Sequence, residues 1–118
     1  MILTDTELEE TRAELRQSIG TIYERSAPAA DRVQRADRTA AGEESSGLWR
    51  HLGQEFGAVG LATPVEYGGG GAGLAELAVL FEVDGARLGC VPLLGSVLAL
   101  EALRRSGDES AIGRWAAG

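Results

Sequence analysis

One segment constrains the fold of this chain more than any other, because it is apolar around most of a helical circumference. Between residues 91 and 103, Glu101 is the only charged side chain. Leucine and valine cover most of the helical circumference, at Val91, Leu93, Leu94, Val97, Leu98, Leu100 and Leu103. A helix that is apolar nearly all round must be buried nearly all round. The other helices expected here are too modest to enclose it, so the chain should oligomerise, or this helix should face another domain or an apolar ligand.

The chain has the size and composition of one small folded domain, which we place at residues 1–118. Its 118 residues include 44% hydrophobic and 25% charged side chains, which is ordinary for a globular protein and excludes disorder throughout. No apolar run reaches the ~18 residues that a membrane span needs. The N-terminus turns acidic at Asp5 and has neither a basic nor an apolar signal region, so no secretory signal is expected.

Charge and residue usage exclude several classes of function. The formal net charge is −7, which disfavours nucleic-acid binding through phosphate neutralisation. All 11 basic residues are arginine, so the chain can form neither a P-loop nor a Schiff base on lysine. Cys90 is the single cysteine, which excludes an internal disulfide and a cysteine zinc site. A reducing, cytoplasmic location is therefore the expectation.

Capping and breaking residues predict an all-α chain of about five helices. Thr4 and Glu7 form a capping box, Pro28 limits the first helix, and Gly107 ends the fourth. No run shows clean period-2 alternation. The predicted helices are about 5–25, 46–56, 73–88, 92–105 and 109–116.

The segments between these helices are polar or glycine-rich. Residues 27–46 are expected to form a loop or a marginal helix, because Val33 is their only large apolar side chain. Residues 57–73 contain Pro64 and four consecutive glycines, so we expect an irregular loop there. The helix at 73–88 should place its charged side chains outward, at Glu76, Glu82, Asp84 and Arg87. Its expected core side chains are Leu74, Leu77, Leu80, Phe81 and Leu88.

Few residues have a pattern that suggests chemistry. Gly68, Gly70 and Gly73 match a dinucleotide fingerprint formally, but no strand precedes them, so a tight loop with positive φ is the better interpretation. His51 has no partners at ligand spacing and is expected to be structural, and Cys90 is expected to be a small core residue. No metal site is predicted. A base with a raised pKa is possible in principle at any of three glutamates, but a solvated helix face is preferred for Glu66, Glu82 and Glu101.

The order of several motifs resembles the N-terminal part of acyl-CoA dehydrogenases. The resemblance runs from about Thr4 to the end of the chain. Its middle part is Leu80-Phe81-Glu82-x-x-Gly85-Ala86-Arg87, in which Val83 and Asp84 depart from the family pattern. Its last part is Ala102-Leu103-x-x-x-Gly107-Asp108. Its longest part is Leu48-Trp49-x-x-Leu52-x-x-Glu55-x-Gly57-x-x-Gly60-Leu61-x-x-Pro64-x-Glu66-Tyr67-Gly68-Gly69-x-Gly71.

The resemblance implies the helical N-terminal domain of a flavoprotein, present as a fragment or a short subunit. In the family a β domain follows and carries much of the FAD site, and a C-terminal helical bundle usually supplies the catalytic glutamate. The chain ends about where the family crosses into the β domain. We therefore expect FAD in the complete enzyme but not on this chain alone, and we assign no catalytic, cofactor-binding or metal-binding residue. The expected partners are the remaining domains or a complementary subunit, in a homo- or hetero-oligomer, and an acyl thioester.

One binding role carries over from the resemblance. In the family, the helix that matches 92–105 borders the fatty-acyl part of the substrate cavity, which implies substrate-binding positions at Leu93, Leu94, Ser96 and Val97. Small residues at Gly89, Gly95 and Ser96 would leave room for a ligand, although close helix packing would give the same pattern. The alternative function is a non-enzymatic helical module that binds a partner protein through this helix.

Overall fold

The chain is all helical in the residues that its structure, a computed structural model, describes, which are 2–40 and 46–116. This part contains no strand, and none of its helices is long and apolar enough to cross a membrane. Three short helical turns accompany the helices: η1 (Ala29–Asp31), the π-helical η2 (His51–Glu55) and η3 (Val65–Tyr67). The α-helices are α1 (Asp5–Ser26), α2 (Arg32–Ala40), α3 (Ser46–Arg50), α4 (Leu74–Arg87), α5 (Leu93–Ser106) and α6 (Glu109–Ala116). The prediction of an all-α fold is confirmed.

The helices begin and end at the predicted signals. The Glu7 backbone N–H donates to Thr4 Oγ1, and the Glu7 carboxylate accepts from the Thr4 backbone N–H at 2.7 Å, so the capping box is formed. Gly107 ends α5 in the left-handed region with φ of 80°. Asp108 then accepts from the Ala111 backbone N–H at 3.0 Å and caps α6.

Two predicted segments differ from the structure. The helix predicted at 46–56 is α3 followed by a wider π-helical turn, which ends before Gly57 at φ of 75°. In the polar segment, the marginal-helix alternative is right for Arg32–Ala40, while residues 41–45 lie outside the described residues. Apolar periodicity could not predict α2, because its inward anchor is the side chain of Arg35, which is only 6% exposed.

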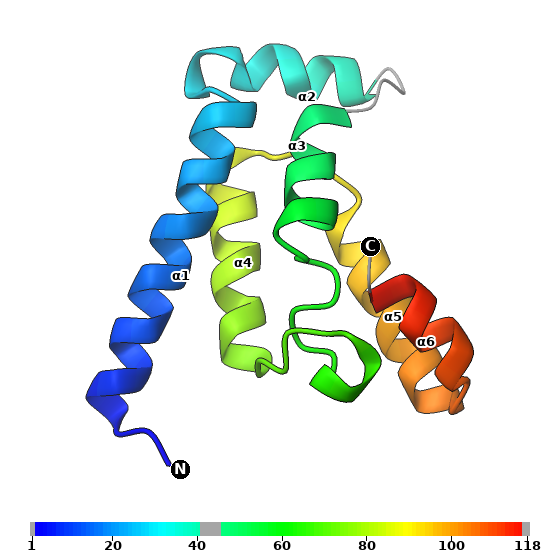
Figure 1. The fold of residues 1–118 in the computed structure, drawn as a ribbon. Helices are drawn as coiled ribbons and strands as arrows, with labels where there is room; N and C mark the ends of the chain where they lie inside the picture. The colour runs from blue at the N-terminus through cyan, green and yellow to red at the C-terminus, as the bar shows by residue number, and fades with distance from the viewer. Residues whose placement is uncertain (1, 41–45, 117–118) are drawn as a thin grey trace.

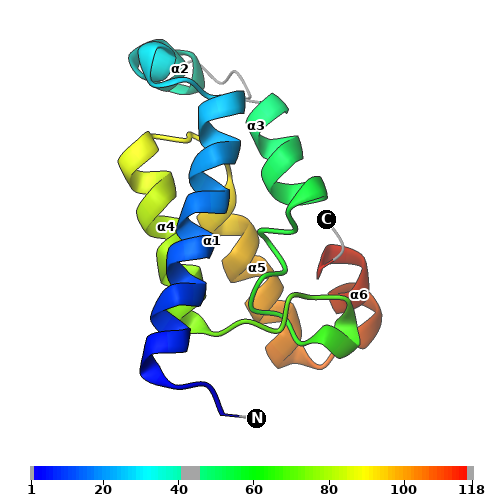
Figure 2. The same ribbon diagram turned by 60° about the vertical axis from the view of Figure 1, so that its left-hand side comes forward.

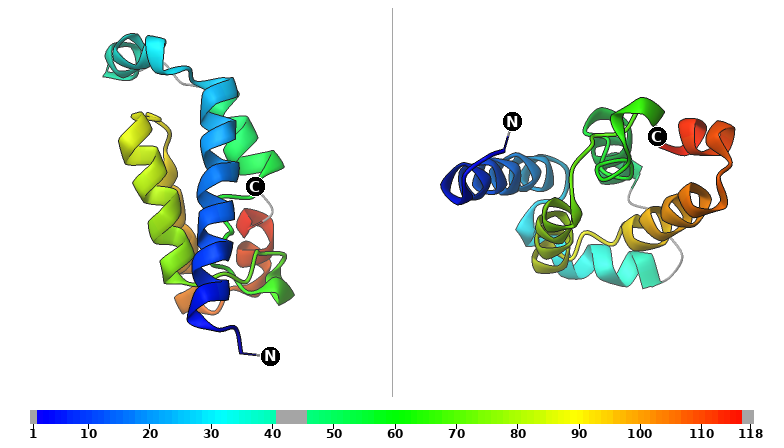
Figure 3. Two further views of the ribbon diagram at one scale, coloured as in Figure 1. Left: turned by 90° about the vertical axis from the view of Figure 1, so that its left-hand side faces the viewer. Right: turned by 90° about the horizontal axis from the view of Figure 1, so that it is seen from below.

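The helices lie in a flat arrangement. α1 runs alongside α4 and also contacts α3 and η2, while α5 and α6 pack together as a second pair (Figures 1 and 2). α2 lies across one end of α1 and α3 (Figure 1). The molecule measures 43 × 36 × 18 Å, and its thin dimension is visible in the left view of Figure 3. Because a helix with its side chains is about 10–12 Å across, a slab of this thickness cannot cover α5 on both sides.

The main core lies where α1, α3, α4 and the start of α5 meet. It is built on side chains with no more than 1% exposure, among them Ile19, Leu52, Leu80 and Leu93. A smaller cluster of Val59, Leu100 and Ile112 joins α5 to α6. The α5 helix is thus buried along one stripe and not all round, as the size of the chain predicted.

The predicted burial or exposure of three side chains, on α4 and at its end, is wrong. Leu74 and Leu88 were expected in the core, but they are 81% and 48% exposed. Leu74 stands at the first position of α4 and takes no part in the main core, and Leu88 leaves the helical face because it caps α4 in the left-handed region. Asp84 was expected to point outward, but it is part-buried and accepts a hydrogen bond from the hydroxyl of Tyr23, which is fully buried.

The burial of Asp84 predicts an unusual pH dependence of stability. Burial raises the pKa of Asp84 above its ordinary value of 3.8, and the hydrogen bond from Tyr23 offsets part of the effect. The folded chain therefore binds this proton more tightly than the unfolded chain, so the contribution of Asp84 to stability is full below pH 3.8 and is lost as pH rises through the raised pKa. We expect the stability of the wild type relative to Asp84→Asn to fall steadily as pH rises from acid to neutral. Urea unfolding of both proteins across this range measures the difference, and a difference that grows with pH would contradict the expectation.

Candidate functional site

An apolar cleft of about 520 Å³ lies between α4, α5 and the Gly-rich loop, by which we mean residues 57–73. Small-molecule sites in proteins usually enclose about 300–1,000 Å³ and are mainly apolar with a few polar groups. α4 and its preceding glycine contribute Gly73, Leu74, Leu77 and Phe81, and the loop contributes Val59, Ala62, Thr63 and Ala72. The α5 side of the cleft is formed by Leu94, Val97, Leu98, Leu100, Glu101, Arg104 and Arg105.

The polar end of the cleft is a compact group of one acid and two bases on α5. Arg104 holds Glu101 with two hydrogen bonds of 2.8 and 2.9 Å, and Arg105 Nε adds a third at 3.1 Å. The hydrogen bonds from Arg104 are the main cause that lowers the pKa of Glu101. Glu101 is the only carboxylate among the cleft residues, and a lowered pKa makes it a poor general base. Glu101 is therefore better interpreted as an ion-paired residue on a solvated helix face than as a base.

The four positions assigned to substrate binding separate into two pairs. Leu94 and Val97 line the cleft, and Leu94 is 59% exposed. Leu93 points the other way and is buried in the main core at 1% exposure. Ser96 does not line the cleft, and its hydroxyl donates to the Pro92 carbonyl at 2.6 Å.

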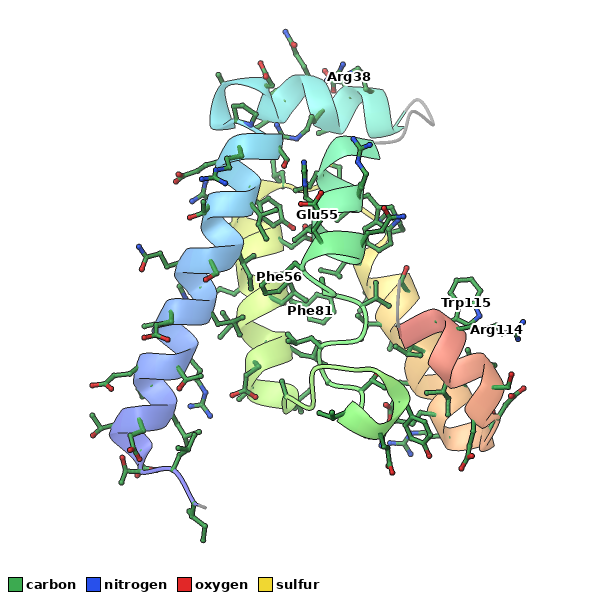
Figure 4. All side chains as sticks on the ribbon, viewed as in Figure 1. Arg38, Glu55, Phe56, Phe81, Arg114 and Trp115 are labelled. Atoms are coloured by element: carbon green, nitrogen blue, oxygen red, sulfur yellow. The ribbon has the colours of Figure 1, made fainter. Side chains whose placement is uncertain are left out.

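Sequence reasoning missed the cleft residues outside these four positions. Leu98 lines the cleft and is 59% exposed, and Leu74 and Phe81, which were assigned to the core, form the facing wall on α4. Figure 4 labels Phe81 on α4, directed toward the middle of the molecule. A leucine that faces a cleft and one that faces a core have the same periodicity, so no signal in the sequence separated them.

The Gly-rich loop is closed by its own backbone. The Gly70 and Ala72 N–H groups donate to the Gly60 and Leu61 carbonyls at 2.9 and 3.0 Å, and Gly71 N–H donates to Thr63 at 2.9 Å. Gly68 and Gly71 have φ of 85° and 67°, so the predicted tight loop with positive φ is confirmed. An amide that already donates within the loop cannot also cradle a phosphate, and the fingerprint-like glycines are therefore structural.

The remaining candidate side chains show ordinary surroundings. His51 Nδ1 lies 2.8 Å from Glu55 Oε2, beside a second, smaller pocket of about 220 Å³ near the end of α1. Glu82 pairs with Arg16 at 3.2 Å, and Glu66 is exposed. Cys90 was expected in the core but is only part-buried. Within residues 2–40 and 46–116, no three potential metal-ligating side chains gather in one place.

The fold and the cleft define this protein as an α-helical domain with an apolar ligand-sized groove and an incompletely covered helix. The sequence profile of the acyl-CoA dehydrogenase N-terminal domain matches residues 9–118. The chain belongs to the acyl-CoA dehydrogenase family and corresponds to its N-terminal domain. This result supports the enzyme-domain interpretation over the interaction module.

Curated relatives are similar over most of this chain. It is 38% identical to acyl-CoA dehydrogenase IpdE2 of Mycolicibacterium smegmatis over 96 residues. These aligned residues make up 81% of this chain and 30% of that protein. The IpdE2 protein of Mycobacterium tuberculosis is 38% identical over 95 residues, covering 80% of this chain and 29% of that protein. Mitochondrial isovaleryl-CoA dehydrogenase of Pongo abelii is 32% identical over 107 residues, covering 87% of this chain and 24% of that protein. No solved structure matches the chain significantly. The chain thus spans less than a third of the length of these relatives.

The family generally uses FAD, and the described residues do not fit a dinucleotide well. The loop amides that could face a pyrophosphate donate within the loop. The two arginines at the cleft already share Glu101. No step of a reaction is therefore assigned to a flavin on the described part of this chain.

Proposed function

We propose that this chain serves an FAD-dependent acyl-CoA dehydrogenase as its N-terminal domain or as a short subunit, and that its cleft forms one wall of the acyl-binding cavity. The observation that carries the proposal is the cleft itself, whose α4 and α5 walls present leucine, valine and phenylalanine side chains. The names of the relatives, two acyl-CoA dehydrogenases and an isovaleryl-CoA dehydrogenase, support an acyl thioester as the substrate class.

Leu94, Val97 and Leu98 would contact the acyl group directly from the α5 side. The transfer of each methylene from water to such a surface contributes up to about 0.8 kcal/mol. Leu93 and Ser96 would act indirectly, because Leu93 anchors the start of α5 in the core and Ser96 bonds to the first turn of the helix. The four positions assigned from the resemblance thus divide into two that touch the ligand and two that hold the helix.

The chemical step needs groups that the described residues do not bring to the cleft. The family reaction removes a proton next to the thioester carbonyl and passes a hydride to the flavin. Glu101 is held ionised by two arginines and is unsuited to accept that proton. We propose that the base, the flavin and the remaining walls come from other domains or a complementary subunit, in the reducing cytoplasm that a single free cysteine suits.

The purified chain should show no acyl-CoA dehydrogenase turnover. Mixing it with FAD, a straight-chain acyl-CoA and an electron acceptor tests this, since reduction of the acceptor is followed directly. Turnover above that of the mixture without protein would contradict the proposal that the base and the flavin come from other domains or a complementary subunit.

The cleft should bind the acyl part of a thioester with an affinity that rises with chain length. We expect each added methylene to tighten binding by up to about fourfold, the equivalent of 0.8 kcal/mol. The double substitution Leu94→Gln with Leu98→Gln should flatten this dependence. Val33→Gln is the matched control, because Val33 is 71% exposed on α2 and lies outside the cleft. Calorimetry with acyl-CoA esters of increasing length measures the slope, and an equal slope in all three proteins would exclude the cleft as the acyl site.

A further inference from the structure

The turn that joins α4 to α5 has an unfavourable backbone conformation. Leu88 and Cys90 have φ of 47° and 56°, and they are the non-glycine residues with positive φ in the described part of the chain. Left-handed backbone is costly for residues that carry a Cβ, and it persists only where the surroundings enforce it. The structure must therefore contain contacts that hold this turn.

The first of these contacts is a buried hydrogen-bonded pair. Tyr23 on α1 is fully buried and donates its hydroxyl to Asp84 Oδ1 on α4. Gly89 lies directly on this pair: a Cβ on Gly89 would come within 2.7 Å of Tyr23 Cε1 and closer still to Asp84 Oδ1. The Gly89 backbone N–H also donates to the Asp84 carbonyl at 3.2 Å. Residue 89 is thus a glycine because of close packing, and the small side chain does not open space for a ligand.

The second contact comes from α2. The side chain of Arg35 is 6% exposed, and its guanidinium donates to the Pro28 carbonyl at 3.0 Å and to the Arg87 carbonyl at 3.3 Å. Arg87 is the last residue of α4, where unpaired carbonyls accumulate and a cation is favourable. Arg35 therefore fixes the end of α4 immediately before the left-handed residues begin.

The turn determines how the two main walls of the cleft lie relative to each other. Leu77 and Phe81 on α4 form one wall, and Leu94 and Val97 on α5 form the other. Only five residues, 88–92, separate the two helices. A change in the path of the turn must change the separation or the tilt of the walls.

We propose that Tyr23, Asp84 and Arg35 are positioning residues that hold the α4–α5 turn in its left-handed conformation and thereby set the shape of the cleft. The part of this proposal that concerns acyl binding rests on the function proposed above. We name the unit formed by these three side chains and residues 88–90 the turn latch.

Cys90 provides a direct reporter of the turn latch, because it is the only thiol in the chain and lies within the turn. We expect Tyr23→Phe to raise the rate at which Cys90 reacts with 5,5′-dithiobis(2-nitrobenzoate) by roughly tenfold or more, the change expected when a buried polar group loses its partner. Asp84→Asn should keep the rate near that of the wild type, because an amide oxygen still accepts from Tyr23. Arg35→Met should also raise the rate, and it replaces Tyr23→Phe in the comparison if that variant does not fold.

The control is Ile19→Val, which shortens a fully buried apolar side chain on the same helix and so weakens the core without removing a hydrogen bond. Hydrogen exchange of the amides in residues 88–98 is measured alongside the thiol reaction. Faster exchange there in Tyr23→Phe, but not in Ile19→Val at a matched loss of global stability, supports the proposal. Equal thiol rates or equal exchange in the two variants would overturn it, because the turn would then open only by global unfolding.

Acyl-CoA affinity completes the test. Tyr23→Phe should weaken acyl-CoA binding severalfold, and the single substitution Asp84→Asn should leave the affinity near the wild-type value. Faster thiol reaction with unchanged affinity would overturn the link between the turn latch and the cleft. If the wild type binds no acyl-CoA, the proposed function fails, whereas the thiol and exchange data still decide whether these residues hold the turn.

Discussion

Replacing Gly69 with alanine is expected to lower the free energy of unfolding by about 2–3 kcal/mol, the cost of forcing atoms into a space that is already filled. A Cβ at this position would lie 2.5 Å from Thr63 Cβ and 2.6 Å from the Thr63 carbonyl carbon. The backbone cannot move aside easily, because Thr63 also accepts from the Gly71 N–H and donates to the Gly60 carbonyl. For a chain of this length the melting temperature should fall by roughly 10 °C.

Two other glycines serve as matched controls for this prediction. Gly68 has φ of 85° and open space around a Cβ, so Gly68→Ala should cost about 1–2 kcal/mol through backbone conformation alone. Gly95 lies within α5, also with open space, and Gly95→Ala should stabilise the chain by about 0.5–1 kcal/mol. Thermal unfolding of the three variants gives the order, and the packing argument fails if Gly69→Ala is no worse than Gly68→Ala. A loss of nucleotide affinity with unchanged melting would indicate a phosphate site instead.

The second large effect concerns association of the isolated chain. Leu94 and Leu98 are each 59% exposed on neighbouring turns of α5, and Leu74 on α4 is 81% exposed at the same cleft. Burial of a leucine side chain is worth roughly 1.5–3 kcal/mol, so an apolar surface of this kind favours contact with another molecule. We expect the wild-type chain to self-associate, and the double substitution Leu94→Gln with Leu98→Gln to weaken association by about 100-fold or more.

Sedimentation equilibrium measures this association, and circular dichroism shows whether helix content is retained. Leu98 is substituted together with Leu94 in preference to Val97, because Val97 is part-buried. Trp115→Gln is the control, because Trp115 is 63% exposed on α6 and projects away from the molecule (Figure 4). A wild-type chain that stays monomeric at high concentration would show that the uncovered face of α5 does not drive assembly.

The sequence predicted the helices well because their ends depend on local chemistry. A capping box needs only Thr4 and Glu7, three residues apart, and a left-handed end needs only a glycine such as Gly107. The π-helical turn at His51–Glu55 has no such local signal. Neither does α2, whose buried anchor is an arginine that donates to the nearby Pro28 carbonyl and to the carbonyl of Arg87, 52 positions away.

The candidate site was only partly predictable for a different reason. Apolar periodicity identifies a residue that avoids water, but whether its neighbour is a core or a cleft depends on elements elsewhere in the chain. Leu93 and Leu94 are adjacent in sequence, and one is buried while the other opens onto the cleft. The Tyr23–Asp84 pair joins residues 61 positions apart, so no spacing rule could have connected them.

The self-bonded backbone of the Gly-rich loop has a consequence for how this protein can vary. Its path is determined by main-chain bonds and by a few glycines, while side chains such as Val65 and Glu66 point into solvent. Those outward positions can therefore change in size and charge without disturbing the wall that the loop gives to the cleft. In a saturation library, most substitutions should be rejected at Gly69 and Gly71 and accepted at Glu66. The outer surface of the loop can therefore change during evolution, whereas the path of its backbone cannot.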